Sequence, residues 1–311
     1  MFKPEYYPIR SSLKFYAFIL FMLFALESRP QGCSDPGFCS IQSMNPAGIA
    51  DTLKDRNNTF HAGFTFGMSQ HEILVFTPFV EYTRLLGRNF SFSGKVNFGL
   101  LSGELANTIG PSDFYLSMSY NFLGHFFVTG GVKVPFNDGN KKKEGMPLPM
   151  NYQLSLGTTD ILLGVGYKIK RFSFTAGYQQ PVTQNNNQFL ATDYSVNSRE
   201  LKYYSTRNYY KTADVMLRLS FIAVHSKKIT LITGLVPIYH IQNDTYQEPD
   251  GNRVTLSGSQ GLTLNLNVIL QYHIAKSQFL ELSVGAPAIS RKVRPDGLSK
   301  FAIGFGYNIS F

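Results

Sequence analysis

The sequence predicts an all-β protein: an antiparallel up-and-down transmembrane β-barrel of about twelve strands, with a range of about 12–14, closed by a C-terminal strand ending at Phe311. Three observations support this fold: side chains that alternate in residues 301–311, a signal-like N-terminus, and connections that alternate in length. In residues 301–311 every second side chain is large and apolar, and those between are small or polar. Because successive strand side chains point to opposite faces, this segment would turn one face to lipid and one to a lumen.

The N-terminus predicts export. Lys3, Arg10 and Lys14 precede an apolar run over residues 15–26, which ends in the polar residues 27–30. A basic start, a short apolar core and a polar exit are typical of a secretory signal peptide, and a membrane helix needs about 20 apolar residues. We predict a signal peptide over residues 1–32, with its cleavage position left open, and a route through the periplasm to the outer membrane of a Gram-negative bacterium.

Alternation also marks the other strands, each near the expected length of about ten residues. The cleanest is 261–274, in which Leu264 and Leu266 oppose Asn265 and Asn267. Segments 152–156 and 201–204 are further candidates, which would raise the total to about fourteen. The predicted strands are residues 59–68, 71–85, 89–101, 112–122, 125–136, 159–169, 172–180, 211–224, 228–241, 261–274, 277–289 and 299–311.

Connection lengths provide an independent test. Bacterial barrels have short periplasmic turns and long outer loops, so connections should alternate when counted back from a periplasmic Phe311. The first connection, Ser69–Gln70, is short on the outer side and is the exception. The long connections are residues 290–298, 242–260, 181–210 and 137–158, and residues 102–111 are medium to long. The short connections are residues 275–276, 225–227, 170–171, 123–124 and 86–88.

The barrel is predicted to occupy residues 58–311. Residues 33–57 precede it and would either lie in the periplasm or fold into the lumen. Cys33 and Cys39 can form a disulfide in an oxidising compartment, although two free thiols or lipidation of Cys33 are alternatives. A Cys pair with this spacing and no nearby His is not a metal site, and we predict no metal.

The alternation phase also predicts which polar side chains point into the lumen. They can pair with one another and solvate the wall, or form a constriction that selects solutes by charge. A barrel of this size is largely filled by side chains, which argues against a wide general porin. The predicted lumen-facing residues are Lys95, Lys133, Lys168, Asp214, Arg218, Gln271, His273 and Glu281.

The chain shows no sequence motif of catalysis or cofactor binding. Its six histidines lack metal-binding spacing, and it has no nucleophile elbow, phosphate loop or dinucleotide fingerprint. We therefore predict a protein without cofactor that is not an enzyme. An outer-membrane hydrolase using His240 and Asp244, at the outer end of a predicted strand, remains an alternative. The net charge of +9 is scattered apart from residues 141–143, which favours contact with lipid headgroups and not nucleic acid.

Three segments resemble outer-membrane barrels linked to the meta pathway of phenol degradation, within the broader group of long-chain fatty-acid and aromatic-hydrocarbon channels. Residues 110–120 (GPSDFYLSMSY) resemble the G-x-S-D segment of that family, residues 131–136 (GVKVPF) its K-x-P strand end, and residues 154–164 (LSLGTTDILLG) its S-L-G-T-x-D segment. Residues 32–39 (GCSDPGFC) are similar to the opening of outer-membrane proteins from Bacteroidetes-type bacteria. The resemblance implies passive passage of small lipophilic solutes.

The leading functional hypothesis is therefore an outer-membrane barrel that passively admits small hydrophobic or amphipathic compounds. The alternative is a structural or assembly barrel of a secretion or gliding machinery, because residues 35–40 and 45–46 loosely resemble the opening of the secretion-linked barrel family. Expected partners are outer-membrane lipids, a small lipophilic solute and the barrel insertion machinery. Phe311 resembles the aromatic C-terminal residue that this machinery reads.

Overall fold

The computed structural model describes residues 56–122, 124–297 and 299–311. The predicted signal peptide, Cys33 and Cys39 lie outside these residues, as does the segment 33–57 except for its last two positions. The long strands are β1 (Asn58–Ser69), β2 (Leu74–Leu86), β3 (Phe90–Ser102), β4 (Asn107–Phe122), β5 (Phe126–Pro135), β8 (Asp160–Ile169), β9 (Phe172–Pro181), β10 (Asp214–His225), β11 (Ile229–His240), β14 (Gly261–Ala275), β15 (Gln278–Ile289) and β16 (Ser299–Ser310).

Short elements occupy the connections. No helix among the described residues is long and apolar enough to cross a membrane. The short elements are η3 (Gln70–Glu72), β6 (Lys142–Lys143), β7 (Met146–Pro147), η4 (Met150–Tyr152), η5 (Ala191–Asp193), η6 (Arg199–Lys202), β12 (Thr245–Gln247) and β13 (Arg253–Thr255).

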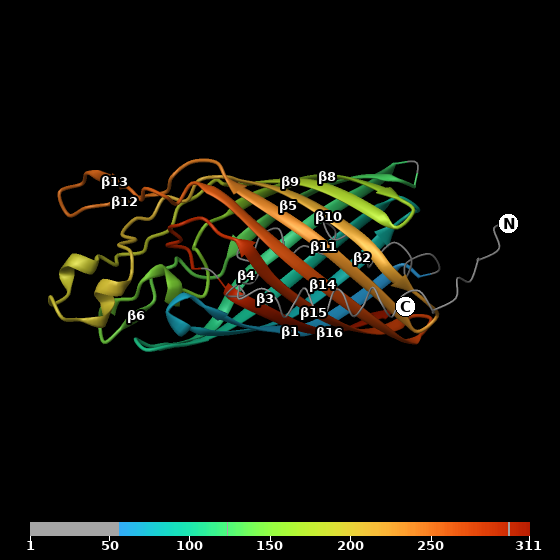
Figure 1. Cartoon of the computed structure of the whole chain (residues 1–311), viewed down its shortest axis with the longest axis horizontal. Coiled ribbons are helices and arrows are strands. Elements are labelled where there is room, and N and C mark those ends of the chain that lie inside the picture. The colour runs from blue at the N-terminus through green and yellow to red at the C-terminus, as the bar shows by residue number, and fades with distance from the viewer. Residues whose placement is uncertain (1–55, 123, 298) are drawn as a thin grey trace.

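The long strands close into one antiparallel barrel in the order β1-β16-β15-β14-β11-β10-β9-β8-β5-β4-β3-β2 (Figure 1). The last strand pairs with the first, in a register that runs from Thr59↔Ser310 to Met68↔Phe301. The backbone N–H of Phe311 also donates to the Asn58 carbonyl at 2.9 Å. The predicted twelve-stranded barrel closed by its C-terminal strand is confirmed.

Several strand bounds differ by a few residues from the sequence prediction, and two differences change the connections. Residues 152–156 and 201–204 do not span the barrel; they fall at η4 and η6 and in the loops beside them. Strand β4 begins at Asn107 and not at residue 112, so the β3–β4 connection is short. Gly110 and Pro111 suggest a turn, but β3 pairs through this point, with Phe98 opposite Pro111. Pro111 is tolerated because it lies at a register shift, where a bulge removes the need for its N–H.

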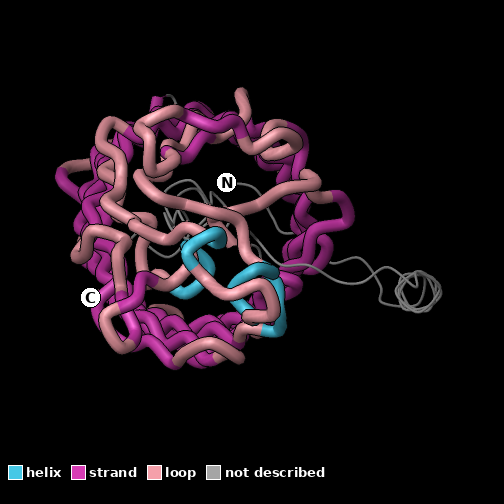
Figure 2. The backbone as a smooth tube through the Cα atoms, turned by 90° about the vertical axis from the view of Figure 1, so that its left-hand side faces the viewer, coloured by secondary structure: helices cyan, strands magenta, loops and turns pink. Residues whose placement is uncertain are grey.

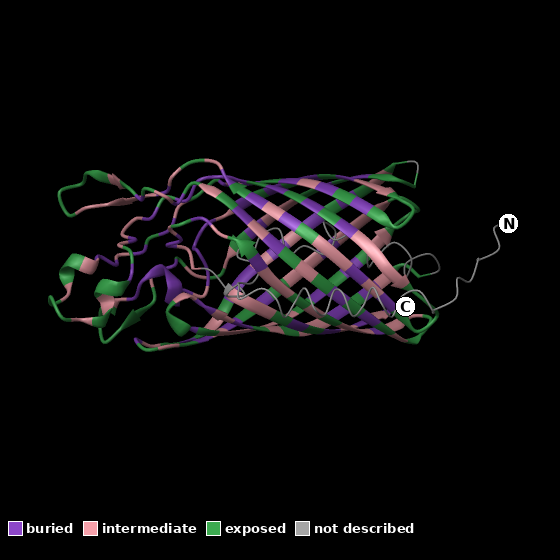
Figure 3. Cartoon of the chain, viewed as in Figure 1, coloured by how far each residue is buried: buried purple, intermediate pink, exposed green. Residues whose placement is uncertain are grey.

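The two faces of the wall differ as the alternation predicts. In β16, Ile303 and Phe305 are about two-fifths exposed on the outside, whereas Gly304, Gly306 and Asn308 are buried. The same banding of exposed and buried residues runs around the barrel (Figure 3). This arrangement suits lipid outside and packed side chains inside.

The two ends of the barrel are unequal. The short turns lie at the end that also carries the C-terminus, and β6, β12 and β13 lie at the opposite end (Figure 1). At that opposite end, loops and short helices cross the opening of the strand ring (Figure 2). These outer loops have their own buried apolar clusters, one containing Ile73, Leu148, Tyr152, Phe189 and Tyr203, and one containing Met150, Leu156, Tyr209 and Leu256. Packed loops therefore lie across part of the outer mouth.

Candidate functional site: the barrel lumen

An apolar patch lies on the inner wall of the barrel. It consists of Tyr115 on β4, Leu162 on β8, Met216 on β10, and Val236 and Ile238 on β11, all buried and in mutual contact. We call these five residues the lumenal apolar cluster. Their strand neighbours Leu163, Val215 and Leu217 are exposed on the outside, so the cluster faces the lumen and not lipid.

A buried ion pair joins β5 to the start of β8. The Nζ of Lys133 lies 2.8 Å from Oδ2 of Asp160, and both side chains are almost fully buried. Lys133 also donates to the Thr158 hydroxyl at 3.1 Å, and the Gln179 amide donates to Asp160 at 2.5 Å. The Lys133 ammonium and the Asp160 carboxylate are thus held in one hydrogen-bonded group.

Asp113 on β4 anchors the same loop. The Ser155 hydroxyl donates to Oδ1 of Asp113 at 2.6 Å, and the Ser112 hydroxyl donates to the Leu154 carbonyl. The three segments that resemble the phenol-pathway barrels therefore converge, because they contribute Asp113, Lys133 and Asp160 to one part of the wall. They fix the loop between β5 and β8 inside the mouth of the barrel.

Gly157 shows why this loop needs a glycine. Its φ of +68° lies in the left-handed region. A Cβ atom at this position would lie 2.5 Å from the carbonyl carbon and oxygen of Asp138. Position 157 thus requires glycine both for its positive φ and for the close approach of the backbone at Asp138.

His240 is the centre of a second buried network, at the outer end of β11. Its Nδ1 lies 2.7 Å from Oδ1 of Asp214 and its Nε2 lies 2.7 Å from Oδ1 of Asp244. Because each ring nitrogen faces a carboxylate, both must donate, and the ring is an imidazolium. Lys211 forms an ion pair with Asp214 at 2.7 Å, and the Thr212 hydroxyl lies 2.9 Å from Nε2 of His240.

This network ties three outer loops to the barrel. The Tyr209 hydroxyl donates to Asp244 at 2.7 Å, and Arg291 forms an ion pair with Asp296 at 2.8 Å. Burial, together with the nearby Asp244, raises the pKa of Tyr209. Burial alone would raise the pKa of Asp296, but Arg291 and Arg294 outweigh it and lower that pKa below the ordinary value. At neutral pH Tyr209 is therefore neutral and Asp296 is ionised.

The hydrolase alternative can be judged on this geometry. The structure brings His240 and Asp244 together. The ring of His240 also lies between the Thr212 hydroxyl and the Asp214 carboxylate, which is the spatial arrangement of a nucleophile, a base and an acid. However, His240 is 1 % exposed and its Nε2 already faces Asp244. This arrangement supports a structural role, because no substrate can reach the ring.

Two of the predicted lysines lie in the half of the barrel nearer the short turns. Lys95 on β3 is opposite Glu81 in the strand register, and its Nζ lies 4.2 Å from the centre of the Phe79 ring. Lys168 on β8 lies with its Nζ 5.9 Å from the ring centre of Phe127. Both contacts are cation–π geometries within about 6 Å of a ring.

Three other predicted residues also lie in this half. Gln271 donates to Glu281 at 3.1 Å, across the β14–β15 pair. His273 has its Nε2 at 3.2 Å from the Thr230 hydroxyl. Within the predicted set, Gln271 and Glu281 are thus joined by a hydrogen bond.

The last predicted residue, Arg218 on β10, is buried at 4 % exposure. Its Nε has no hydrogen-bond partner among the described residues. Four residues of the polar networks, Asp113, Asp160, Lys211 and Arg291, are missing from the predicted lumen-facing set. Asp113, Asp160 and Lys211 lie in predicted strands and Arg291 lies in a predicted loop. Asp113 and Asp160 also lie in the segments that carry the resemblance.

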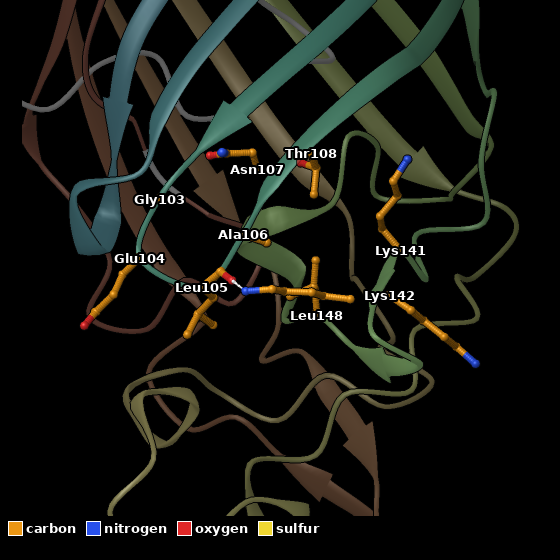
Figure 4. A pocket seen from close by; sticks show the side chains of 10 residues that line it. Gly103, Glu104, Leu105, Ala106, Asn107, Thr108, Lys141, Lys142 and Leu148 are labelled. Atoms are coloured by element: carbon orange, nitrogen blue, oxygen red, sulfur yellow. Dashed lines mark hydrogen bonds between the residues drawn. The ribbon is translucent and has the colours of Figure 1, made fainter.

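A pocket of about 380 Å³ lies at the outer rim, between residues 103–108 and 141–143 (Figure 4). Strand β4 extends beyond the end of β5, since their pairing begins only at Asp113↔Pro135. Lysine side chains donate to carbonyls at this rim: Lys141 to Ile109 on β4 at 3.2 Å, and Lys143 to Leu105, in the connection before β4, at 2.6 Å. The run at residues 141–143 thus partly serves to satisfy an edge strand.

In the described part of the chain, no group of three or more His, Cys, Asp or Glu residues is arranged to hold a metal ion. The barrel, its apolar outer face and its unequal ends define a closed twelve-stranded barrel of the outer-membrane type. No family model matches the chain, and no curated protein sequence matches it.

Solved structures with this fold do match. An outer-membrane channel from Pseudomonas putida F1 is similar with a TM-score of 0.60 at 12% identity, over 85% of this chain and 98% of that one. The toluene transporter TodX of Pseudomonas putida gives a TM-score of 0.46 at 11% identity, over 91% and 97% of the two chains. The monoaromatic hydrocarbon channel CymD gives a TM-score of 0.46 at 9% identity, over 92% and 99%.

Proposed function

We propose that the protein is an outer-membrane channel for the passive passage of small hydrophobic or amphipathic compounds. The lumenal apolar cluster carries the proposal, because Leu162, Met216 and Val236 are apolar side chains turned away from lipid and into the barrel. The interior of a transmembrane barrel is ordinarily polar, so an inner wall that contacted only water would not need these apolar side chains. The structurally similar barrel from Pseudomonas putida F1 is itself an outer-membrane channel.

The partly covered mouth limits what can pass. The outer loops pack against one another through Phe189, Tyr203 and Tyr152, so a wide permanent pore is not supported. Binding sites for small ligands are mostly apolar with a few placed polar groups, and the lumen offers both. The predicted lumen-facing lysines and acids would then set the polarity of the passage.

Passage can be measured in a porin-deficient Gram-negative host, because its lipopolysaccharide leaflet slows lipophilic solutes. Cells that express the protein should take up labelled toluene faster than cells with an empty vector, and the purified barrel should show conductance in planar bilayers. A barrel that yields neither uptake nor conductance would contradict the proposal. A stoichiometric partner recovered on purification would instead favour the assembly alternative.

Two earlier predictions accompany this proposal. Phe311 is 56 % exposed, so its side chain is accessible to the barrel insertion machinery. We therefore keep the proposal that Phe311 is the insertion signal. The Bacteroidetes resemblance of residues 32–39 falls on residues that the structure does not describe, and no comparison supports it.

A further inference from the structure

Arg218 is a buried cation on the inner wall whose charge nothing in the described chain balances. It is 4 % exposed and has no hydrogen bond or ion pair with a described residue, and its Nε is a buried donor without an acceptor. Lys133 and Lys211, which are equally buried, have carboxylates within 2.8 Å and 2.7 Å. A buried guanidinium without a counter-charge is costly, so an anion is expected to meet it.

The residues beside Arg218 can complete a polar site. Thr175 on β9 lies directly opposite Arg218 in the strand register, and its buried hydroxyl has no partner in the described chain. A hydroxyl can donate to the same anion as the guanidinium.

The residues toward the outer rim are apolar. Met216 is the next inward-facing residue of β10, and it pairs with Ile238 on β11. Two residues along a strand span about 6.6 Å, which is roughly the length of a benzene ring carrying a carboxylate. A ligand whose charge meets Arg218 would therefore lay its hydrocarbon part against the lumenal apolar cluster.

We propose that Arg218 is the anion-binding residue of the lumen, and that it recognises the carboxylate of a small amphipathic monocarboxylate, aromatic or short-chain aliphatic. This inference rests on the proposed channel function and names the class of solute. The planar guanidinium can donate two parallel hydrogen bonds to a carboxylate, and the two groups carry opposite charges. A neutral amide or alcohol lacks the charge that balances the guanidinium.

Binding can be tested without transport. The purified full-length barrel is titrated by calorimetry with sodium benzoate and with benzamide, its neutral isostere. The wild type should bind benzoate at least about tenfold more tightly than benzamide, as expected for a hydrogen bond to a charged group. Arg218→Gln should lower the benzoate affinity at least about tenfold and leave benzamide unchanged. Arg171→Gln, the same change in an exposed periplasmic turn, should bind both ligands like the wild type.

Three results would overturn the proposal: equal affinity of the wild type for the two ligands, no benzoate binding by the wild type, or wild-type benzoate binding by Arg218→Gln. Folding of each variant is checked by heat-dependent migration on gels. If Arg218→Gln does not fold, Thr175→Val keeps the charge and should weaken benzoate alone by about two- to fivefold.

The outcomes separate the two proposals. Toluene uptake without any preference for benzoate would leave the channel standing and remove the anion site. Benzoate binding that depends on Arg218, in a barrel that passes no solute, would remove the channel and leave the site.

Discussion

Lys133 and Asp160 are directly opposite each other on β5 and β8, and their side chains form an ion pair of 2.8 Å with almost no exposure to solvent. The pair lies where β8 begins, at the end of the loop that folds into the mouth. Thr158 and Gln179 satisfy further hydrogen bonds of the two groups. The pair therefore has two roles: it joins β5 to β8 in the wall, and it fixes the position at which the loop ends.

Breaking this pair on one side should be costly. Asp160→Asn would leave the Lys133 ammonium buried without its counter-charge, and we expect a loss of about 3–5 kcal/mol in the free energy of unfolding. Lys133→Met should have a similar effect. The measurement is urea-induced unfolding of the refolded barrel, followed by gel migration.

The matched control is Lys228→Met, the same replacement at an exposed lysine in a short turn, which should change stability little. The double variant Lys133→Met with Asp160→Leu should recover most of the loss, because apolar replacements leave no charge buried. A double variant as unstable as both singles combined would show that the pair acts only through packing.

The sequence predicts the face of the wall on which Lys133 lies, but it does not predict its partner. Alternation along a strand decides which face a residue is on, because the period of two is fixed by backbone geometry. The partner depends on how β8 is placed beside β5, after a long connection whose path no local pattern specifies. The same holds for His240. The sequence places Asp244 four residues away, whereas Asp214 is brought opposite only by the β10–β11 register.

The loops were least predictable. Their clusters combine residues from distant connections, such as Leu148 with Phe189 and Tyr203. These residues show no period, since loops have none. Proline and glycine also misled the prediction at residues 110–111, because a bulge lets a strand continue through signals that usually end one.

Gly157→Ala should loosen the inward loop. The substitution places a Cβ 2.5 Å from the Asp138 carbonyl and keeps a φ of +68°, so we expect about 1–3 kcal/mol of destabilisation. Faster protease cleavage between residues 138 and 157 is the readout. Gly145→Ala, in the same loop, has φ +85° and nothing within 4 Å of its Cβ, so it isolates the dihedral cost. Equal effects of the two variants would contradict the steric argument.

His240→Gln should release the loops that the imidazolium connects. A neutral amide cannot balance both Asp214 and Asp244, which would face each other across the ring position. We expect at least about tenfold faster amide exchange in the loop of residues 241–260, since two charge-assisted hydrogen bonds are lost. Exchange is measured by mass spectrometry. His125→Gln, in an exposed turn at the other end, serves as the control and should leave that loop unchanged.

Acid should weaken the loop between β15 and β16. The pKa of Asp296 is lowered in the folded protein: burial opposes the shift, and Arg291 and Arg294 overcome it. Its stabilising contribution is therefore fully present above the ordinary value, about pH 4, and is lost as the pH falls through the lowered pKa. Asp296→Asn should cost about 1–3 kcal/mol at pH 7 and less at about pH 2. Unfolding in urea at both pH values measures this, with exposed Asp250→Asn as the control. A cost that does not depend on pH would contradict the electrostatic explanation.

Enlarging a side chain of the lumenal apolar cluster should obstruct passage. Met216 is fully buried on the inner face of β10, and Leu217 beside it is 51 % exposed on the outer face. Met216→Trp adds bulk in the lumen, so toluene uptake by cells should fall by more than about fivefold, as expected when a hydrophobic constriction narrows. Leu217→Trp adds the same group toward lipid and should leave uptake unchanged. The overpacked variant is expected to lose about 1–3 kcal/mol, so its assembly is verified by gel migration before uptake is compared. Equal uptake by the two assembled variants would show that solutes do not pass along this part of the wall.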